Sequence, residues 1–252
     1  MFSGLSISAL PGIPLIQPGH DLAEIITHAA YGAGITLADH DILVVTSKIV
    51  SKAEGRFVSL ADIQPGDEAL HLASITGKDA RMVELVLRES QAVSRAAPNV
   101  LVVRHRLGFI SANAGIDQSN AAGDEDIALL LPIDPDASAQ GIREGLRERT
   151  GAHVGVVLSD SHGRPFRMGN VGVAIGVAGI PALRDLRGSK DLFGRPLRIT
   201  IQGYADMIAS AAGLLSGEGA EGLPVVLIRG LSHDGDGKSS DLNRPLEQDL
   251  YR

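Results

Sequence analysis

Short runs of branched aliphatic residues alternate with longer amphipathic stretches along this chain, and that alternation restricts the folds it can form. The short runs are bounded by Gly, Pro, Asp or Ser, as is typical of buried strands. The predicted strands are residues 5–10, 42–46, 100–104, 154–159, 171–177, 197–201 and 224–229. The predicted helices are residues 21–31, 78–90, 137–150 and 204–215. Since the two kinds interleave without the strict relay of a doubly wound sheet, the predicted fold class is α+β (mixed α/β).

The chain has 252 residues, which is near the upper limit of what a single hydrophobic core can serve. No stretch has the composition of a linker between domains. We therefore expect one domain over residues 1–231, with residues 232–252 as a C-terminal arm of the same domain. The arm begins with a polar, glycine-rich segment and ends with apolar residues that can dock on the body of the chain or on a partner subunit.

Composition and charge exclude several classes of function. The chain has no Cys, so disulfides, thiolate metal sites and a cysteine nucleophile are ruled out, and a reducing compartment is favoured. The formal charge of −7 disfavours binding to nucleic acid or to an anionic membrane, although it allows a local basic pocket. No apolar run approaches the roughly 20 residues that span a bilayer, and the N-terminus lacks the pattern of an export signal. A cytoplasmic protein is therefore expected.

The first stretch with recognisable chemistry follows the predicted strand 42–46. Ser47, Lys48 and Lys52 place a hydroxyl and two ammonium groups at a strand exit, where they can bind phosphate oxygens. The glycine spacing of a Walker A loop is missing. An ordinary basic helix start explains the same residues, so the pattern alone leaves both interpretations open.

A second stretch, residues 108–120, is rich in Gly and other small residues and fits neither a strand nor a helix well. Such a loop lets the backbone approach a ligand closely, and Asp117 offers a hard oxygen ligand to a metal ion. The alternative is a turn in which Asp117 or Asn120 bonds its own backbone.

A third stretch places Asp160 and Ser161 at the end of the predicted strand 154–159, ahead of Arg164 and Arg167. Carboxylate and hydroxyl oxygens suit Mg²⁺ or Mn²⁺. The two guanidinium groups are predicted to hold a substrate phosphate or carboxylate. A polar strand end without function is the alternative. Neither a zinc-type histidine spacing nor a Gly-x-Ser-x-Gly nucleophile turn is present, so zinc and serine-hydrolase chemistry are disfavoured.

A fourth stretch, residues 216–222, alternates Gly with Ser, Glu and Ala between a predicted helix and a predicted strand. Its spacing alone predicts a glycine-terminated helix followed by a flexible turn.

These stretches occur together, and in the same order, in a known family. The matching segments are residues 10–14, 45–48, 54–56, 115–120, 159–161, 163–167, 173–176, 185–188 and 205–206. Through them, residues 5–231 resemble the coenzyme F-420:L-glutamate ligases, the gamma-glutamyl ligases of coenzyme F-420 biosynthesis, and residues 244–252 have a family-like ending. One such motif is weak, whereas the ordered set is specific.

The resemblance implies a ligase that joins L-glutamate to the lactyl carboxylate of the coenzyme precursor and converts GTP to GDP and phosphate. A carboxylate is a poor acyl donor because its leaving group would be an oxide, so an acyl phosphate intermediate is expected. Phosphoryl transfer depends mainly on positioning and on charge neutralisation. The implied cofactors are Mg²⁺ or Mn²⁺ at two sites, with a monovalent cation such as K⁺ as a further candidate.

The resemblance also assigns roles to single residues. Asp117 and Asp160 are similar to ligands of one metal ion. The predicted catalytic set adds Arg164 and Arg167 to them, on the chemistry of their guanidinium groups and not on the resemblance. Ser161 and Glu218 are similar to ligands of a second metal ion, although relatives often carry Gln in place of Glu218. The positions similar to nucleotide contacts are Pro11, Gly12, Ile13, Pro14, Ser47, Lys48, Lys52, Asn120, Ser216, Gly217, Glu218, Gly219, Ala220, Glu221, Gly222 and Leu223.

Members of the family have an α+β fold of their own and form an intertwined homodimer, and the resemblance implies both features for this chain. The expected partners are therefore GTP, L-glutamate, the coenzyme precursor and a second copy of the chain, without nucleic acid or membrane. Two alternatives keep the nucleotide site. One is a GTP- and metal-dependent carboxylate–amine ligase with another acceptor, and the other is a non-catalytic nucleotide-binding module.

Overall fold

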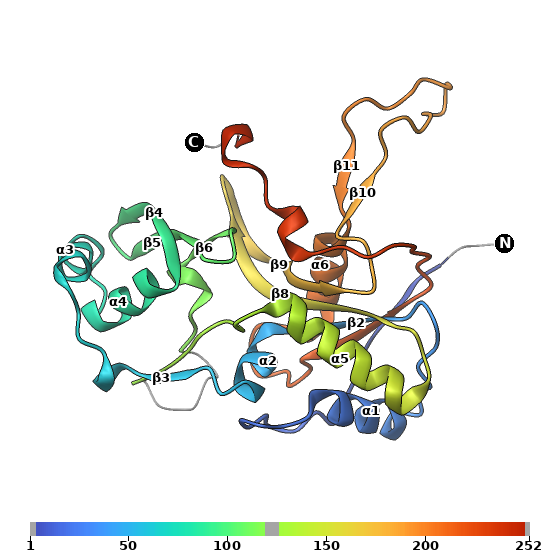
Figure 1. Cartoon of the computed structure of the whole chain (residues 1–252), viewed down its shortest axis with the longest axis horizontal. Coiled ribbons are helices and arrows are strands. Elements are labelled where there is room, and N and C mark those ends of the chain that lie inside the picture. The colour runs from blue at the N-terminus through green and yellow to red at the C-terminus, as the bar shows by residue number, and fades with distance from the viewer. Residues whose placement is uncertain (1–3, 119–125, 250–252) are drawn as a thin grey trace.

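A five-stranded mixed sheet lies at the centre of a computed structural model that describes residues 4–118 and 126–249 (Figure 1). The strand order is β1 (Ser6–Ala9), β12 (Val225–Arg229), β2 (Ile42–Thr46), β8 (Gly155–Arg164) and β9 (Arg167–Ala178). Within it, β2 and β8 run parallel and the other neighbouring pairs are antiparallel. Parallel pairing places Thr46 opposite Ser159. The residues that follow β2 are therefore neighbours of the C-terminal half of β8.

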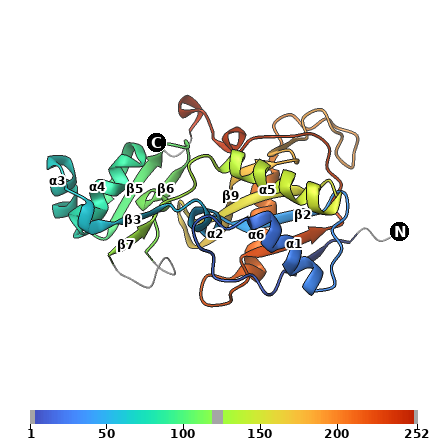
Figure 2. The same cartoon turned by 60° about the horizontal axis from the view of Figure 1, so that its bottom comes forward.

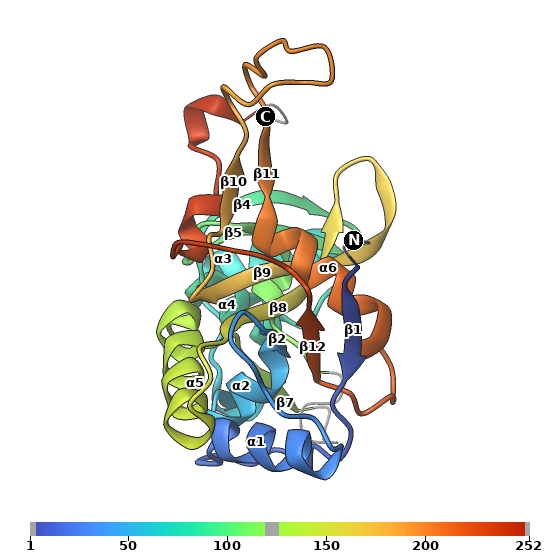
Figure 3. The same ribbon diagram turned by 90° about the vertical axis from the view of Figure 1, so that its right-hand side faces the viewer.

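Helices cover both faces of this sheet, as Figure 3 shows. They are α1 (Leu22–Gly32), α2 (Ser47–Ala53), α5 (Pro135–Thr150) and α6 (Tyr204–Ser216). Because side chains alternate along a strand, Leu43 and Val45 of β2 belong to the buried cluster of α1 and α5, whereas Val44 belongs to that of α6. The predicted mixed α/β class is confirmed.

Local sequence sets the ends of α5. The Asp134 side chain caps its start by accepting a hydrogen bond from Ala137 N at 3.0 Å, and Gly151 ends it with φ of 76°. In the described part of the chain, no helix has both the length and the apolar composition needed to cross a membrane.

Residues 57–118 and 126–131 form a side lobe with its own buried cluster, seen on the left in Figures 1 and 2. Its elements are β3 (Phe57–Ser59), α3 (Asp67–Thr76), α4 (Ala80–Arg88), β4 (Ser90–Ala97), β5 (Val100–His105), β6 (Ile110–Ala112) and β7 (Ile127–Leu129), with 3-10 turns at Leu60–Asp62 and Asn113–Gly115. Strands β4, β5 and β6 form one antiparallel sheet, and β3 pairs with β7. Apolar residues of α3, α4 and β5 fill the space between them.

Several predicted elements change in the structure. The predicted strand 197–201 is wrong, because only its last residue enters β11 (Ile201–Gly203), which pairs with β10 (Leu183–Asp185). The stretch 108–120, predicted to be irregular, contains β6 and a 3-10 turn. Strand β4 is absent from the predicted strands because it carries no aliphatic run. It is extended in the structure because it pairs along β5.

Two hairpins leave the body of the molecule, and both carry exposed apolar side chains. The β8–β9 hairpin presents Phe166 and Met168, and the β10–β11 arm presents Leu192, Phe193 and Ile199. Figure 3 shows the β10–β11 arm rising well away from the helices. Such exposure of large apolar residues on projecting segments is typical of contact surfaces.

The C-terminal segment lies along the body of its own chain. Ser239 donates to the Asp136 carboxylate of α5 from its backbone N–H at 3.1 Å, and its hydroxyl does so as well. Asn243 Nδ2 donates to Leu107 O in the side lobe at 3.0 Å. The segment includes 3-10 turns at Ser239–Leu242 and Leu246–Gln248, and residues 250–252 of the predicted arm lie outside the described residues.

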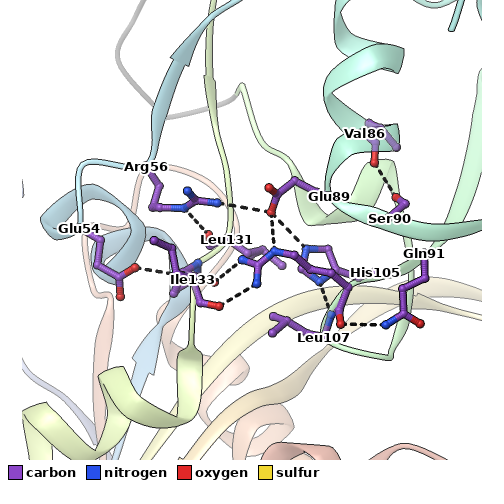
Figure 4. Close-up of polar contacts among 12 residues, drawn as sticks. Glu54, Arg56, Val86, Glu89, Ser90, Gln91, His105, Leu107, Leu131 and Ile133 are labelled. Atoms are coloured by element: carbon purple, nitrogen blue, oxygen red, sulfur yellow. Dashed lines mark hydrogen bonds and ion pairs between the residues drawn. The ribbon is translucent and has the colours of Figure 1, made fainter.

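A network of charged groups joins the side lobe to the segments that enter and leave it (Figure 4). The Glu89 carboxylate, at the end of α4, accepts hydrogen bonds from Arg106 Nε at 3.0 Å and from Arg56 Nη2 at 3.4 Å. The two arginines also donate to the backbone oxygens of Leu131 and Ile133. The His105 imidazole facing Glu89, and next the Arg106 guanidinium, lower the pKa of Glu89 to about 2 against the opposing effect of burial.

We expect Glu89→Gln to reduce the free energy of unfolding at pH 7 by about 2 kcal/mol, because it leaves two arginines without their carboxylate. The folded pKa of Glu89 lies near 2 and its ordinary value is 4.5, so this contribution is complete above the ordinary value and is lost as the pH falls toward 2. Urea unfolding at pH 7, 4 and 2.5 measures it. The exposed Glu68→Gln on α3 is the control, and a difference between wild type and Glu89→Gln that does not shrink with pH would contradict the expectation.

Candidate active site

A cavity of about 1590 Å³ opens where the ends of β2 and β8 meet the side lobe. Its wall comes from four regions: the segment after β1, the start of α2, the second half of β8 with its partner β9, and the turn after α6. Phe57, Asp79 and Arg81 of the side lobe close it from the other side. The volume exceeds the roughly 300–1,000 Å³ of an ordinary small-molecule pocket, so it has room for two ligands.

The start of α2 brings a hydroxyl and an ammonium group to two carboxylates. Ser47 Oγ donates to Asp160 Oδ1 at 3.1 Å, and Lys48 Nζ lies 2.6 Å from Asp117 Oδ2. One of the two interpretations of Ser47, Lys48 and Lys52 is a basic helix start. The structure shows that helix start, and the three side chains line the cavity. Asp117 also pairs through its backbone with Leu129, which fixes the main chain of Asp117 within the side lobe.

Two lysines one helical turn apart share this wall of the cavity. Burial first, and then the charge of Lys48, lower the pKa of Lys52, while the Asp117 carboxylate opposes that shift. An anion bound beside both lysines would offset the unfavourable effect of the Lys48 charge on the Lys52 ammonium. The pair is therefore suited to a phosphate chain.

Strand β8 presents Asp160 and Ser161 on its two opposite faces, because side chains alternate along a strand. Asp160 lies on the α2 face, where it meets Ser47. Ser161 lies on the α6 face, where its Oγ donates to Glu218 Oε1 at 2.6 Å. Two separate pairs of oxygen-bearing side chains, Ser47 with Asp160 and Ser161 with Glu218, therefore open into one cavity.

The glycine-rich turn after α6 forms a wall of the cavity over its whole length. Helix α6 ends at Ser216, and Gly217 follows with φ of 66° and ψ of −175°, a conformation that is essentially restricted to glycine. The Glu221 carboxylate accepts a hydrogen bond from Gly219 N at 2.8 Å and holds the turn in shape. The predicted glycine-terminated helix is confirmed.

The donor atoms of the site fit a hard divalent cation. Asp117, Asp160, Ser161 and Glu218 offer only oxygen, which Mg²⁺ and Mn²⁺ prefer. Within residues 4–118 and 126–249, no three His, Asp or Glu side chains gather closely enough to enclose a metal ion by themselves. That arrangement suits ions such as Mg²⁺, which take one or two carboxylates from the protein and their other ligands from water and substrate phosphate.

The structure brings most of the predicted site residues to this cavity. Those that line it are Ile13, Pro14, Ser47, Lys48, Lys52, Asp117, Asp160, Ser161, Ser216, Gly217, Glu218, Gly219, Ala220, Glu221, Gly222 and Leu223. Pro11 and Gly12 precede the lining segment 13–17. Arg164 and Arg167 lie farther along the β8–β9 hairpin, where Arg164 Nη2 donates to Met168 O at 3.0 Å, and their role as anion clamps stays a prediction. Asn120 lies outside the described residues.

The side lobe supplies cavity residues that sequence reasoning missed. Arg81, at the start of α4, bonds Asp79 and lies 3.2 Å from Asp126, and all three line the cavity. The only local signal at this place is the N-cap pattern of Asp79, which indicates a helix start and no function. Their position at the cavity depends on how the lobe packs against the sheet.

Comparison with known proteins gives one consistent result. Residues 12–230 match the family model described as F420-0:Gamma-glutamyl ligase. A protein of Methanothermobacter thermautotrophicus named coenzyme F420:L-glutamate ligase is 45% identical over 252 residues, covering 99% of each chain. Proteins of the same name from Methanopyrus kandleri and Archaeoglobus fulgidus are each 43% identical, covering 99% and 98% of this chain and 99% and 96% of their own.

Proposed function

The chain belongs to the F420-0:gamma-glutamyl ligase family, and on that premise we propose that it joins L-glutamate to the deglutamylated coenzyme F420 precursor with GTP as the phosphoryl donor. The product is an amide, and GDP and phosphate are released. The observation that carries this proposal is that Asp160 and Ser161 present oxygen atoms from opposite faces of β8 to one cavity, which Asp117, Glu218, two lysines and a glycine-rich turn also line.

The chemistry requires two bond exchanges in one enclosed space. A carboxylate oxygen of the precursor bonds to the γ-phosphorus of GTP, and the bond from that phosphorus to the β,γ-bridging oxygen breaks, which releases GDP. The glutamate nitrogen then bonds to the acyl carbon, the bond from that carbon to the phosphate oxygen breaks, and the nitrogen loses a proton. Both steps need charge neutralisation and alignment more than a nucleophile from the protein.

Residues of the cavity wall have clear tasks in that scheme. Lys48 and Lys52 bind the phosphate chain, and the turn of residues 216–223 encloses the nucleotide from the opposite side. Asp117 and Asp160 would hold one divalent ion, and Ser161 with Glu218 a second. Bound there, Mg²⁺ or Mn²⁺ would neutralise charge that develops on the transferring phosphoryl group. A monovalent cation such as K⁺ remains part of the proposal as an additional requirement to test.

The proposal is tested with purified protein, GTP, L-glutamate and the deglutamylated coenzyme, in Mg²⁺ and in Mn²⁺, with and without K⁺. Mass spectrometry should find a product heavier by one glutamyl unit and an equal amount of GDP. If phosphate is released with another acid or amine but not with L-glutamate and the deglutamylated coenzyme, the protein is a ligase with another acceptor. GTP binding without phosphate release under all conditions would leave a nucleotide-binding module.

We also propose that the active form is a homodimer. The exposed Phe166, Met168, Leu192, Phe193 and Ile199 on the two projecting hairpins support this proposal, because a second copy can cover them. Light scattering after size exclusion should give twice the mass of one chain, 26.3 kDa, and Phe193→Asp should shift the molecule toward the monomer. A monomeric wild type across the micromolar range would refute it.

A further inference from the structure

A buried histidine lies directly behind the wall of the cavity. His162, on β8, is 8% exposed, and its Nε2 lies 3.1 Å from Oδ2 of Asp160. The two residues are two positions apart on one strand, so their side chains share a face. Asp160 lines the cavity, whereas His162 is not among the lining residues. The histidine therefore contacts the site through the carboxylate.

The Asp160 carboxylate is held at both of its oxygens. Ser47 Oγ donates to Oδ1 at 3.1 Å, and His162 Nε2 is within hydrogen-bond distance of Oδ2. A carboxylate has about four lone-pair positions, so each oxygen keeps capacity for a further partner in the cavity. Without one of these donors the terminal torsion of an Asp is broad and roughly two-fold. Both bonds together define one orientation.

The side lobe holds the histidine ring in place. Phe109, in the β5–β6 turn, packs on His162 with ring centres 5.0 Å apart and an interplanar angle of 50°. Phe109 in turn stacks on His105, at 4.9 Å and 3°. His105 is fully buried, and its Nδ1 accepts a hydrogen bond from Leu107 N at 3.0 Å, so that ring is also fixed. A continuous column of three rings thus leads from the side lobe to Asp160.

We propose that His162 is a positioning residue for Asp160: its Nε2–H donates to Oδ2 and aims the carboxylate for a divalent cation, with Phe109 fixing the ring. This inference rests on the proposed function for the presence of that cation. Carboxylates that bind metals are generally hydrogen-bonded from behind, and loss of the donor typically costs about 10–100-fold in metal affinity or activity. The side lobe would then contribute to the metal site through Phe109, which packs on His162, as well as through Asp117.

The test separates the hydrogen bond from the packing of the ring. His162→Phe keeps a ring against Phe109 and removes the donor, whereas His162→Gln places an amide N–H close to the position of Nε2. Binding of Mn²⁺ alone, and of Mn²⁺ with GTP, is measured by electron paramagnetic resonance of the free ion. We expect the Mn²⁺ dissociation constant to rise about 10–100-fold in His162→Phe and far less in His162→Gln.

Two further variants show whether the effect passes through Asp160. Adding His162→Phe to Asp160→Asn should change Mn²⁺ binding no further, because residues that act on one another are not additive. His233→Phe replaces a histidine that is also 8% exposed and does not line the cavity, so it should leave Mn²⁺ binding unchanged. Thermal unfolding of all variants reports any loss of fold.

Each outcome decides between the two proposals. Equal Mn²⁺ affinity in wild type and His162→Phe would overturn the positioning role and leave the proposed ligase intact. A loss in His162→Gln as large as in His162→Phe would also overturn it, since the donor would not matter. Mn²⁺ binding that depends on His162 in a protein without ligase activity would refute only the proposed function. No Mn²⁺ binding by wild type, with or without GTP, would refute both.

Discussion

Asp160→Asn should lower kcat for glutamyl transfer by about 10³-fold or more, while the fold stays intact. The change removes one negative charge at the point where β8 meets Ser47 at the start of α2, in a cavity that the Lys48–Asp117 ion pair also lines. A neutral amide is a weak ligand for Mg²⁺ or Mn²⁺, and a loss of that size corresponds to about 4 kcal/mol of transition-state stabilisation. Single-turnover formation of GDP and of the glutamylated product measures the effect.

The variant is informative because Asn has almost the volume of Asp and can still accept hydrogen bonds. Asp67→Asn on the exposed first turn of α3 is the matched control, and it should be as active as the wild type. Thermal unfolding should place both variants close to wild type. Near-normal turnover by Asp160→Asn would mean that the first cation is bound elsewhere, and it would remove Asp160 from the proposed mechanism.

Gly176→Ala should lower the free energy of unfolding by about 3 kcal/mol or more, because it forces a side chain into a backbone contact. A Cβ atom at this position of β9 would lie 2.4 Å from the carbonyl oxygen of Pro135, the first residue of α5. Neither element can give way easily, since β9 is paired with β8 and α5 is packed on the sheet. The midpoint of urea unfolding measures the loss.

A Gly→Ala substitution in α5 should have the opposite effect on the free energy of unfolding. Gly141 lies on the exposed side of that helix, and a Cβ there would meet nothing within 4 Å. We expect Gly141→Ala to raise the free energy of unfolding by about 0.5–1 kcal/mol, because Ala is the better helix former and has less freedom in the unfolded chain. Equal effects from both substitutions would show that packing at Gly176 is looser than the structure indicates.

Some residues of the candidate site can be identified from their immediate neighbours in the sequence, and others cannot. Residue type, position at the end of a predicted strand or helix and resemblance to a family point to Asp160, Ser161 and the glycine-rich turn at 216–223, and all of them line the cavity. Each of these signals lies within a few neighbouring residues. Asp79 and Arg81 gave no such signal, because their part in the cavity depends on how a separate lobe packs against the sheet.

The positioning role inferred for His162 could not be predicted from the sequence either. A histidine between Ser161 and Gly163 could be a catalytic base or a zinc ligand by residue type, but neither a zinc-type histidine spacing nor a Gly-x-Ser-x-Gly turn supports those functions. Strand alternation places its ring on the face of Asp160, and the turn at Phe109 then covers it. The contact with Asp160 is local in the chain, whereas the packing of Phe109 on His162 joins residues that are distant in the chain.

The sequence by itself determined the mixed α/β class, most of the strands and helices around the central sheet, the family, and the residue types of the candidate site. These follow from hydrophobic periodicity, capping and local motifs, which act over a few residues. The tertiary structure decided that β2 and β8 are parallel neighbours, that the faces of β8 separate Asp160 from Ser161, and that the side lobe closes the cavity. Those features depend on contacts between distant segments, whose free energy comes from burying surfaces that local patterns do not pair with one another.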